Sequence, residues 1–152
     1  MKTTLITGGL GFIGSNICDS LLQKKYTDKC ILLDNFGGYM NPIKDSFIDF
    51  RKQRFSSLKN IIIERCDTSN YKALSSIINK YKPNYIYHTA ALPLAKVSNL
   101  NNEEAKISSV DSTVNIIDAI NLLKNSNQKY QFDRFVYFSS SMVYGDFKKS
   151  TV

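Results

Sequence analysis

Residues 3–14 read TTLITGGLGFIG, and this stretch predicts the fold of the chain. It holds four of the seven glycines. It begins as a short apolar β-run over residues 4–7 and ends where a helical pattern opens at Phe12. Glycines let a backbone turn tightly and approach a phosphate closely, and the new helix directs its free N–H groups at that phosphate. A strand, a glycine turn and a helix in this order therefore predict a phosphate-binding site.

Two glycine spacings fit the same residues. Gly9-x-Gly11-x-x-Gly14 matches the general dinucleotide fingerprint, in which the last glycine lets the helix lie close to the sheet. Gly8-x-x-Gly11-x-x-Gly14, preceded by Thr7, resembles the variant of the short-chain dehydrogenases. The alternatives are a glycine-rich turn without a ligand and a P-loop. A P-loop is disfavoured because no Lys-Ser or Lys-Thr follows the last glycine.

Length and composition predict one globular domain over residues 1–152, with 43% hydrophobic residues. No apolar run approaches the roughly 20 residues of a membrane span, and a strand begins within the first residues. We therefore expect no membrane segment and no signal peptide. Cys18, Cys30 and Cys66 form no metal-binding spacing and no disulfide set. They predict reduced, buried thiols in a cytoplasmic protein without a metal site.

The net charge of +7 raises the question of nucleic-acid binding. The lysines are spread along the whole chain, however, and no dense basic block or aromatic-rich nucleic-acid motif occurs. We therefore expect no nucleic-acid partner. A basic surface also suits an anionic small substrate, and charge alone does not separate these readings.

Asp34 ends a second apolar strand, residues 30–34, and lies twenty positions after Gly14. The dinucleotide fingerprint places an acidic residue near this position, where it accepts hydrogen bonds from the ribose hydroxyls of the adenosine. The alternatives are a helix cap or a solvated loop carboxylate. An Asp here also repels a 2′-phosphate, and no Arg occurs in residues 35–38, so the sequence favours NAD over NADP.

Further apolar runs predict strands at residues 61–63, 85–89 and 134–139. With the strands at residues 4–7 and 30–34, five strands alternate with helical segments. This order predicts an α/β fold with a doubly wound parallel sheet, in which ligands bind at the carboxyl ends of the strands. His88, the only histidine, lies within the fourth strand and is interpreted as a packed core residue rather than a catalytic base.

Helical periodicity predicts helices over residues 11–24 and 70–81 and a long helix that begins at Glu103 after a cap at Asn101 or Asn102. Residues 47–55 are predicted to form a surface helix over a sheet edge, and the alternative is that Arg51, Lys52 and Arg54 contact a cofactor or substrate phosphate. The side chains expected to face the core are Ile13, Ile17, Leu21 and Leu22 in the first helix, Leu74, Ile77, Ile78 and Tyr81 in the second, and Val110, Val114, Ile117 and Leu123 in the last, with Ile116 and Ile120 widening that stripe.

Polar and small residues follow the third and fourth strands. Asp67 can reach the amino group of an adenine, or it can cap the next helix, as can Thr68 or Ser69. The small side chains of Ala90 and Ala91 let a cofactor lie against the backbone. Because parallel strands end at one edge of a sheet, we expect these residues to converge with the glycine turn.

The motifs occur together in an order that resembles the NAD-dependent epimerase/dehydratase family, the extended short-chain dehydrogenases. The resemblance covers essentially the whole chain, and it is greatest to the nucleotide-sugar 4-epimerases. It rests on Thr7-Gly8-Gly9-x-Gly11-Phe12-Ile13-Gly14, Leu33-Asp34-Asn35, Asp67, His88-x-Ala90-Ala91 and Phe135-Val136-Tyr137-x-Ser139-Ser140-x-x-Val143-Tyr144-Gly145.

The resemblance implies a Rossmann-type NAD-binding domain and a role for each matched residue. The backbone N–H groups of Phe12 and Ile13 would bind the pyrophosphate, and Ser140 would hydrogen-bond the reacting sugar oxygen. The implied cofactor-binding residues are Gly8, Gly11, Phe12, Ile13, Gly14, Asp34 and Asn35 at the first two strands, Asp67 and Thr68 beside the adenine, and Thr89, Ala90 and Ala91 on the nicotinamide side.

In the family, NAD takes a hydride from the sugar while a Tyr phenolate takes the hydroxyl proton. The resemblance implies an epimerase of a nucleotide sugar, in particular a UDP-sugar, that forms homodimers as a full-length protein. The alternatives are a dehydratase or a decarboxylase of the same family, and a module that binds NAD without chemistry.

Two departures from the family pattern stand out. Ser109 and Ser112 occupy the Asn and Gly positions of a frequent Asn-x-x-Gly-Thr motif. The family's Tyr-x-x-x-Lys pair normally lies some way beyond the Ser motif. Here only Tyr144 and Lys148 have that spacing, and Gly145 favours a turn between them. We therefore expect residues 1–152 to be the amino-terminal part of a longer enzyme, truncated after the fifth strand, and inactive alone.

Overall fold

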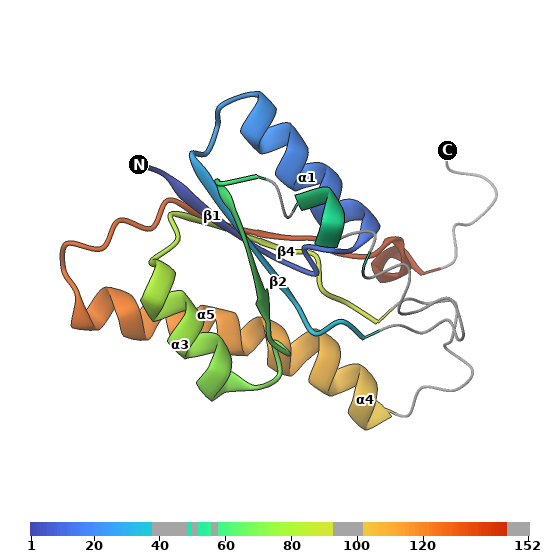
Figure 1. The fold of residues 1–152 in the computed structure, drawn as a ribbon. Helices are drawn as coiled ribbons and strands as arrows, with labels where there is room; N and C mark the ends of the chain where they lie inside the picture. The colour runs from blue at the N-terminus through green and yellow to red at the C-terminus, as the bar shows by residue number, and fades with distance from the viewer. Residues whose placement is uncertain (38–48, 50–51, 56–57, 93–101, 146–152) are drawn as a thin grey trace.

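The computed structural model describes residues 1–37, 49, 52–55, 58–92 and 102–145. Its centre is a parallel sheet with the strand order β3-β2-β1-β4-β5 (Figure 1). The predicted doubly wound α/β fold is confirmed. The strands are β1 (Thr3–Thr7), β2 (Lys29–Asp34), β3 (Ile61–Arg65), β4 (Tyr85–His88) and β5 (Arg134–Tyr137).

The middle of the sheet is apolar because helices cover both of its faces. All five residues of β1 are buried, as are the four central residues of β2. Such continuous apolar runs are typical of parallel strands that never face water. The sheet reverses its direction of growth at β1, because β2 and β3 lie on one side of it and β4 and β5 on the other.

Helices cover both faces of the sheet, and a separate core cluster lies on each face. On one face lie α1 (Phe12–Gln23) and the helical residues 52–55, where Leu10, Cys18 and Phe55 pack against Ile6 and Leu32. The other face holds α3 (Tyr71–Tyr81), α4 (Asn102–Lys106), a π-helical segment (Ile107–Asp111) and α5 (Ser112–Ser126) (Figure 1). The sheet therefore positions its strand ends between two packed layers.

The apolar stripe predicted for the long helix is buried only in part. Ile116, Ile120 and Leu123 are buried as predicted, whereas Val110, Val114 and Ile117 are 42% to 53% exposed. Within α5 the buried residues 116, 120 and 123 follow one another at helical spacing, whereas Val114 and Ile117 lie on a different side, so the predicted stripe combined two faces of one helix. The buried residues of α5 are Ser112, Ile116, Ala119, Ile120 and Leu123.

Two further predictions about the helices are corrected. Ile13 is 52% exposed instead of facing the core, because the small residues Gly14 and Ser15 form the buried side of the first turn of α1. Asn70, rather than Asp67, Thr68 or Ser69, caps α3, where its side chain accepts a hydrogen bond from Ala73 N. Leu74 and Ile78 are buried in α3 as predicted.

Two of the predicted segments lie only partly within the residues that the structure describes. Asn101 lies outside them, and Asn102 is the first residue of α4. Of the predicted helix over residues 47–55, residues 52–55 are helical, and most of the others lie outside the described residues. Phe55 is 2% exposed, so this segment contributes to the core rather than only covering an edge.

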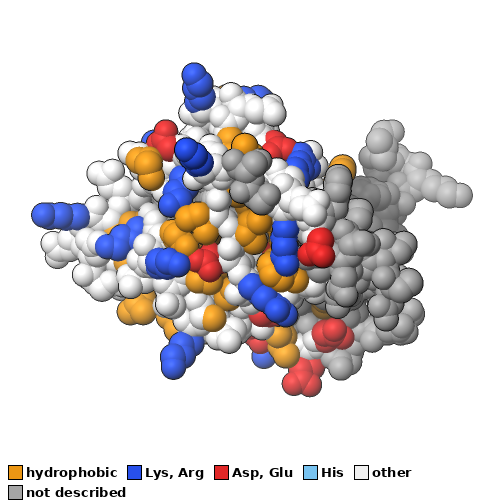
Figure 2. Space-filling model, in the orientation of Figure 1, with side chains coloured by type: hydrophobic (Ala, Val, Ile, Leu, Met, Phe, Trp, Pro, Cys, Tyr) orange, Lys and Arg blue, Asp and Glu red, His pale blue; other side chains and the backbone are white. Residues whose placement is uncertain are grey.

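Figure 2 shows Lys and Arg side chains scattered over one face between apolar and uncharged groups, without a single dense cluster on that face. Cys18, Cys30 and Cys66 are free and buried, as predicted. None of the helices in the described parts of the chain is long and apolar enough to cross a membrane. Within the same parts, no group of three or more His, Cys, Asp or Glu could hold a metal ion.

Candidate functional site

The glycine turn after β1 packs so closely that a Cβ on any of its four glycines would lie less than 3.0 Å from a neighbouring atom. Gly8 has a φ of +64°, and a Cβ there would lie 2.9 Å from Ala90 N, beyond the end of β4. A Cβ on Gly14 would overlap Gly8 O and lie 2.9 Å from Gly9 Cα. The absence of side chains therefore lets the turn bring α1 close against the strand ends.

The first turn of α1 is a suitable anion site. Gly11 is its N-cap, and no side chain of the described residues caps it. The first turn also holds no acidic residue, so the N–H groups of Phe12 and Ile13 and the positive end of the helix dipole face no negative charge from that turn. The side chain of Phe12 is 80% exposed, which is unusual for a large aromatic group.

Asp34 is held beside this turn by two backbone groups. Its Oδ2 accepts a hydrogen bond from Leu10 N (3.1 Å), and its Oδ1 accepts one from Phe36 N (2.9 Å). The carboxylate is thus neither a helix cap nor a freely solvated loop group, which were the alternatives weighed from the sequence. Because each oxygen can accept a second hydrogen bond, the carboxylate still has acceptor capacity for ribose hydroxyls.

Asn35 and Asp67 join the ends of β2 and β3. Asn35 Nδ2 donates to Asp67 Oδ2 (3.0 Å), and Asp67 Oδ1 accepts from the N–H and the hydroxyl of Ser69 (2.9 and 2.7 Å). Partial burial raises the pKa of Asp67, but these hydrogen bonds outweigh it and hold the pKa below its usual value. Thr68 is buried, and its carbonyl accepts from Asn115 Nδ2 (3.0 Å).

Arg65, a cation beside Asp34, was missed from the sequence, whereas Lys52 was weighed there as a possible contact to a phosphate. Arg65 pairs with Asp34 in the register of β2 and β3, and its guanidinium lies 5.5 Å from the centre of the Phe36 ring. Lys52 Nζ lies 4.5 Å from the same ring. The absence of an Arg in residues 35–38 was therefore an incomplete argument, because β3 supplies one. The parallel register was the signal that could have found it.

The ends of β4 and β5 complete the edge of the sheet. Thr89 donates from its N–H and its hydroxyl to Thr7 O (3.2 and 2.7 Å), which joins β4 to the glycine turn. Phe138 N donates to His88 O (3.2 Å), so β4 and β5 are still paired just before Ser140. Ser140 is exposed at this edge, where its carbonyl accepts from Val143 N (3.2 Å).

Tyr144 ends a short 3₁₀ helix (Ser141–Tyr144) and is 74% exposed. Gly145 follows with a φ of +63°, which ends that helix. The predicted turn after Tyr144 is confirmed at this residue, and Lys148 lies outside the described residues.

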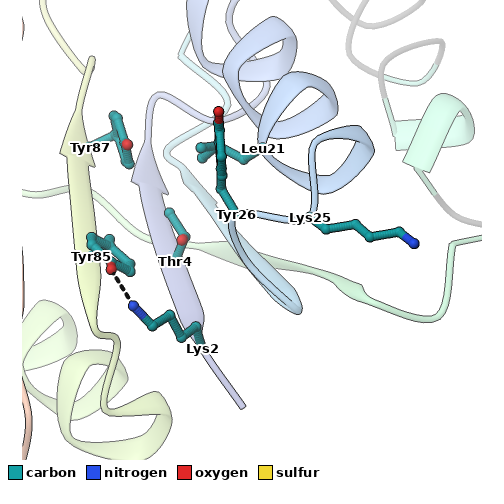
Figure 3. A pocket seen from close by; sticks show the side chains of 7 residues that line it. All are labelled: Lys2, Thr4, Leu21, Lys25, Tyr26, Tyr85 and Tyr87. Carbon is teal, nitrogen blue, oxygen red and sulfur yellow. Dashed lines mark hydrogen bonds between the residues drawn. The ribbon is translucent and has the colours of Figure 1, made fainter.

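A groove of about 410 Å³ lies at the other end of the sheet, near the amino ends of β1 and β4. Figure 3 shows Lys2 donating to the hydroxyl of Tyr85 there (2.6 Å), while the Lys25 side chain points away from the tyrosines. Ligands of doubly wound sheets bind at the carboxyl ends of the strands. The candidate site is therefore the opposite edge, with Gly8, Asp34 and Ala90.

Comparisons with known proteins agree with this geometry. A family model described as the NAD dependent epimerase/dehydratase family matches residues 4–151. UDP-glucose 4-epimerase of Caenorhabditis elegans is 32% identical over 143 residues, which are 93% of this chain and 38% of the relative. dTDP-D-glucose 4,6-dehydratase of Dictyostelium discoideum is 29% identical over 145 residues, which are 95% of this chain and 30% of the relative.

One solved structure illustrates the likeness of fold. UDP-glucose-4-epimerase from Stenotrophomonas maltophila, with bound NAD and formylated UDP-arabinopyranose, matches with a TM-score of 0.73 and 19% identity. The match covers 100% of this chain and 41% of that chain. The chain thus spans less than half the length of each of these three proteins.

Proposed function

We propose, from the premise that the chain belongs to the NAD dependent epimerase/dehydratase family, that it forms the NAD-binding part of a nucleotide-sugar 4-epimerase. The observation that carries the proposal is the close-packed glycine turn, in which Leu10 N donates to the Asp34 carboxylate beside the uncapped first turn of α1. Calorimetric titration of residues 1–152 with NAD tests it. Saturable one-to-one binding supports the proposal, and the absence of heat would contradict it.

The residues present fit NAD in a consistent direction along the sheet. The N–H groups of Phe12 and Ile13 would bind the pyrophosphate, because the first turn of α1 offers uncapped donors. Asp34 would accept from the adenosine ribose, and the Asn35–Asp67 bridge would border the adenine. The remaining residues proposed to line the cofactor are Gly8, Gly11, Gly14, Thr68, Thr89, Ala90 and Ala91.

When bound, NAD supplies hydride acceptance and return at the sugar carbon. In this proposal the Ser140 hydroxyl orients the reacting hydroxyl of a UDP-sugar, from its place at the end of β5. A serine hydroxyl does not remove that proton at neutral pH, so a second group acts as the base. Both an epimerase and a dehydratase are among the relatives, and a 4-epimerase is our choice on the matched motifs.

The choice of NAD over NADP is the first expected result. Because the Asp34 carboxylate faces the ribose position, NAD should bind at least about tenfold more tightly than NADP, or about 1.4 kcal/mol. Asp34→Asn keeps a hydrogen-bond acceptor but removes the charge. The difference between the affinities for NAD and NADP should therefore be smaller in this variant. Calorimetric titration with both cofactors measures it.

Arg65→Ala provides the matched comparison, since this cation lies in register with Asp34. Loss of this side chain should weaken the binding of NADP more than the binding of NAD, because only NADP carries the 2′-phosphate. Equal affinities of the wild-type chain for the two cofactors would remove the ribose role of Asp34.

We also propose that the full protein forms a homodimer through the exposed apolar stripe, defined as Ile107, Val110, Val114 and Ile117. These side chains follow one another at helical spacing and are 39% to 53% exposed. Such a stripe at the surface of a helix favours contact with a second helix. The symmetric partner for a single stripe of this kind is a second copy of the chain.

Val114→Asp should therefore convert dimers to monomers in analytical ultracentrifugation, because it places a charge in the centre of the apolar stripe. Leu122→Asp is the control, since Leu122 is 55% exposed on the same helix but outside the stripe. The control variant should remain dimeric. A wild-type protein that is monomeric at high concentration would contradict the proposal.

The free, buried cysteines are consistent with the cytoplasmic setting proposed for this enzyme.

A further inference from the structure

Three buried polar side chains form a line beneath the candidate site. Thr7 ends β1, His88 ends β4 and Ser112 begins α5, and their exposed fractions are 0%, 1% and 1%. Thr7 Oγ1 lies 2.6 Å from His88 Nδ1, and Ser112 Oγ lies 3.4 Å from His88 Nε2. One imidazole ring thus connects a strand end beside the glycine turn with the first residue of a helix.

The direction of each hydrogen bond in this line follows from its two ends. The Ser112 hydroxyl donates to Ser108 O (2.5 Å), so its oxygen has to accept the proton on His88 Nε2. His88 Nδ1 then carries no proton and accepts from the Thr7 hydroxyl. Thr7 Oγ1 in turn accepts from Ala90 N (3.3 Å). The chain runs without a break from Ala90 to the carbonyl of Ser108.

This line ends at Ala90, beside the glycine turn of the candidate site. Ala90 N is the atom that a Cβ on Gly8 would meet at 2.9 Å, so its position sets the gap between the glycine turn and the end of β4. Burial lowers the pKa of His88 to about 4, which keeps the ring neutral and its two nitrogens distinct at neutral pH. A neutral ring in one tautomer can transmit a fixed geometry, whereas a mixture of tautomers cannot.

We infer that Ser112 is a positioning residue that fixes the Nε2–H tautomer of His88 and thereby holds Thr7 and Ala90 at the spacing the dinucleotide requires. The inference rests on the proposed function for its effect on NAD, but the tautomer itself is a property of the chain alone. Ser112 stands where the resemblance leads one to expect glycine, which has no hydroxyl to accept from the ring.

The tautomer can be read directly because His88 is the only histidine. In the chain labelled with ¹⁵N-histidine, long-range ¹H–¹⁵N spectra at pH 7 should show an unprotonated Nδ1 and a protonated Nε2. The opposite tautomer in the wild-type chain would overturn the inference, whatever the chain binds. This readout does not depend on NAD.

Ser112→Ala removes the acceptor of the Nε2 proton, and the spectrum should then show a mixture of tautomers. The dissociation constant for NAD should rise about fivefold, since a buried donor loses its partner. Thr113→Val is the matched control, because Thr113 Oγ1 also donates to a carbonyl of the same turn, Ser109 O (2.7 Å), but has no contact with His88 among the described hydrogen bonds. The control should change neither the tautomer nor the affinity.

Thr7→Val and Thr7→Ser probe the other end of the line and guard against a Ser112 variant that fails to fold. Thr7→Val should disturb the tautomer and raise the dissociation constant for NAD about tenfold. Thr7→Ser keeps the hydroxyl and should therefore retain the wild-type tautomer and affinity. An unchanged tautomer in a folded Ser112→Ala variant would overturn the inference, and if that variant does not fold, an unchanged tautomer in Thr7→Val would do so. A wild-type chain with the expected tautomer and no affinity for NAD would instead contradict the proposed function.

Discussion

Gly14→Val should lower the free energy of unfolding by about 3 kcal/mol and abolish NAD binding. Gly14 is buried in the first turn of α1, and a side chain there would overlap the carbonyl of Gly8 and crowd Gly9. The obstruction is backbone, which cannot rotate away as a side chain can. The helix would therefore have to move off the sheet, and the N–H groups of its first turn would leave the phosphate position. Urea unfolding followed by circular dichroism and calorimetric titration with NAD measure the two effects.

Ser20→Val is the matched control for this substitution. Ser20 is exposed on the same helix, so valine there costs only a few tenths of a kcal/mol of helix propensity. Its unfolding midpoint and NAD affinity should stay close to those of the wild-type chain. If Gly14→Val behaved like this control, the close approach of α1 to the glycine turn would not be needed for either stability or binding.

Residues 1–152 should show no epimerase activity on UDP-sugars, whereas a protein extended to the length of its relatives should be active. In the proposed function Ser140 orients the sugar hydroxyl, but a serine hydroxyl does not remove its proton at neutral pH. Tyr144 is 74% exposed, and the left-handed Gly145 ends its helical turn, so helix geometry does not align Tyr144 with a lysine four residues later. A positioned acid–base group contributes about 10² to 10⁴ in rate. The activity of the short chain should therefore fall at least about 10³-fold below that of the longer one.

A coupled assay for interconversion of UDP-glucose and UDP-galactose measures this difference. Both proteins should first be shown to bind NAD, so that a lack of turnover is not a lack of cofactor. Tyr144→Phe in the longer protein should leave its rate nearly unchanged. Activity of residues 1–152 that disappears in Tyr144→Phe would make Tyr144 the base and overturn this expectation.

The sequence predicted the sheet and the glycine turn well because their signals are local. Buried parallel strands are short apolar runs, and Leu5, Ile31 and Ile86 lie within such runs. The turn at Gly8 requires a backbone conformation that glycine favours, so its residue type is dictated by its own geometry. Asp34 was found because its distance from the glycines along the chain is fixed by one helix and one strand.

Features that depend on distant segments could not be predicted in the same way. The π-helical turn at Ile107–Asp111 has no signature in apolar spacing. Arg65 reaches Asp34 only through the register of two strands. Asn115, whose side chain binds the carbonyls of Thr68 and Ser69, comes from a helix far along the chain. The role of each of these residues depends on contacts with segments far away in the sequence, so it can be recognised only once the fold is known.

The strand order β3-β2-β1-β4-β5 also governs how the chain matures during its synthesis. β1 is made first and sits in the centre, yet its two partners emerge at different times, β2 early and β4 only after β3 and α3. At roughly 5 to 20 residues per second, several seconds separate the translation of Asp34 from that of His88. Throughout that interval one hydrogen-bonding edge of β1 has no native partner. The nascent chain is therefore most open to mispairing, and to protection by a chaperone, between the completion of β2 and the arrival of β4.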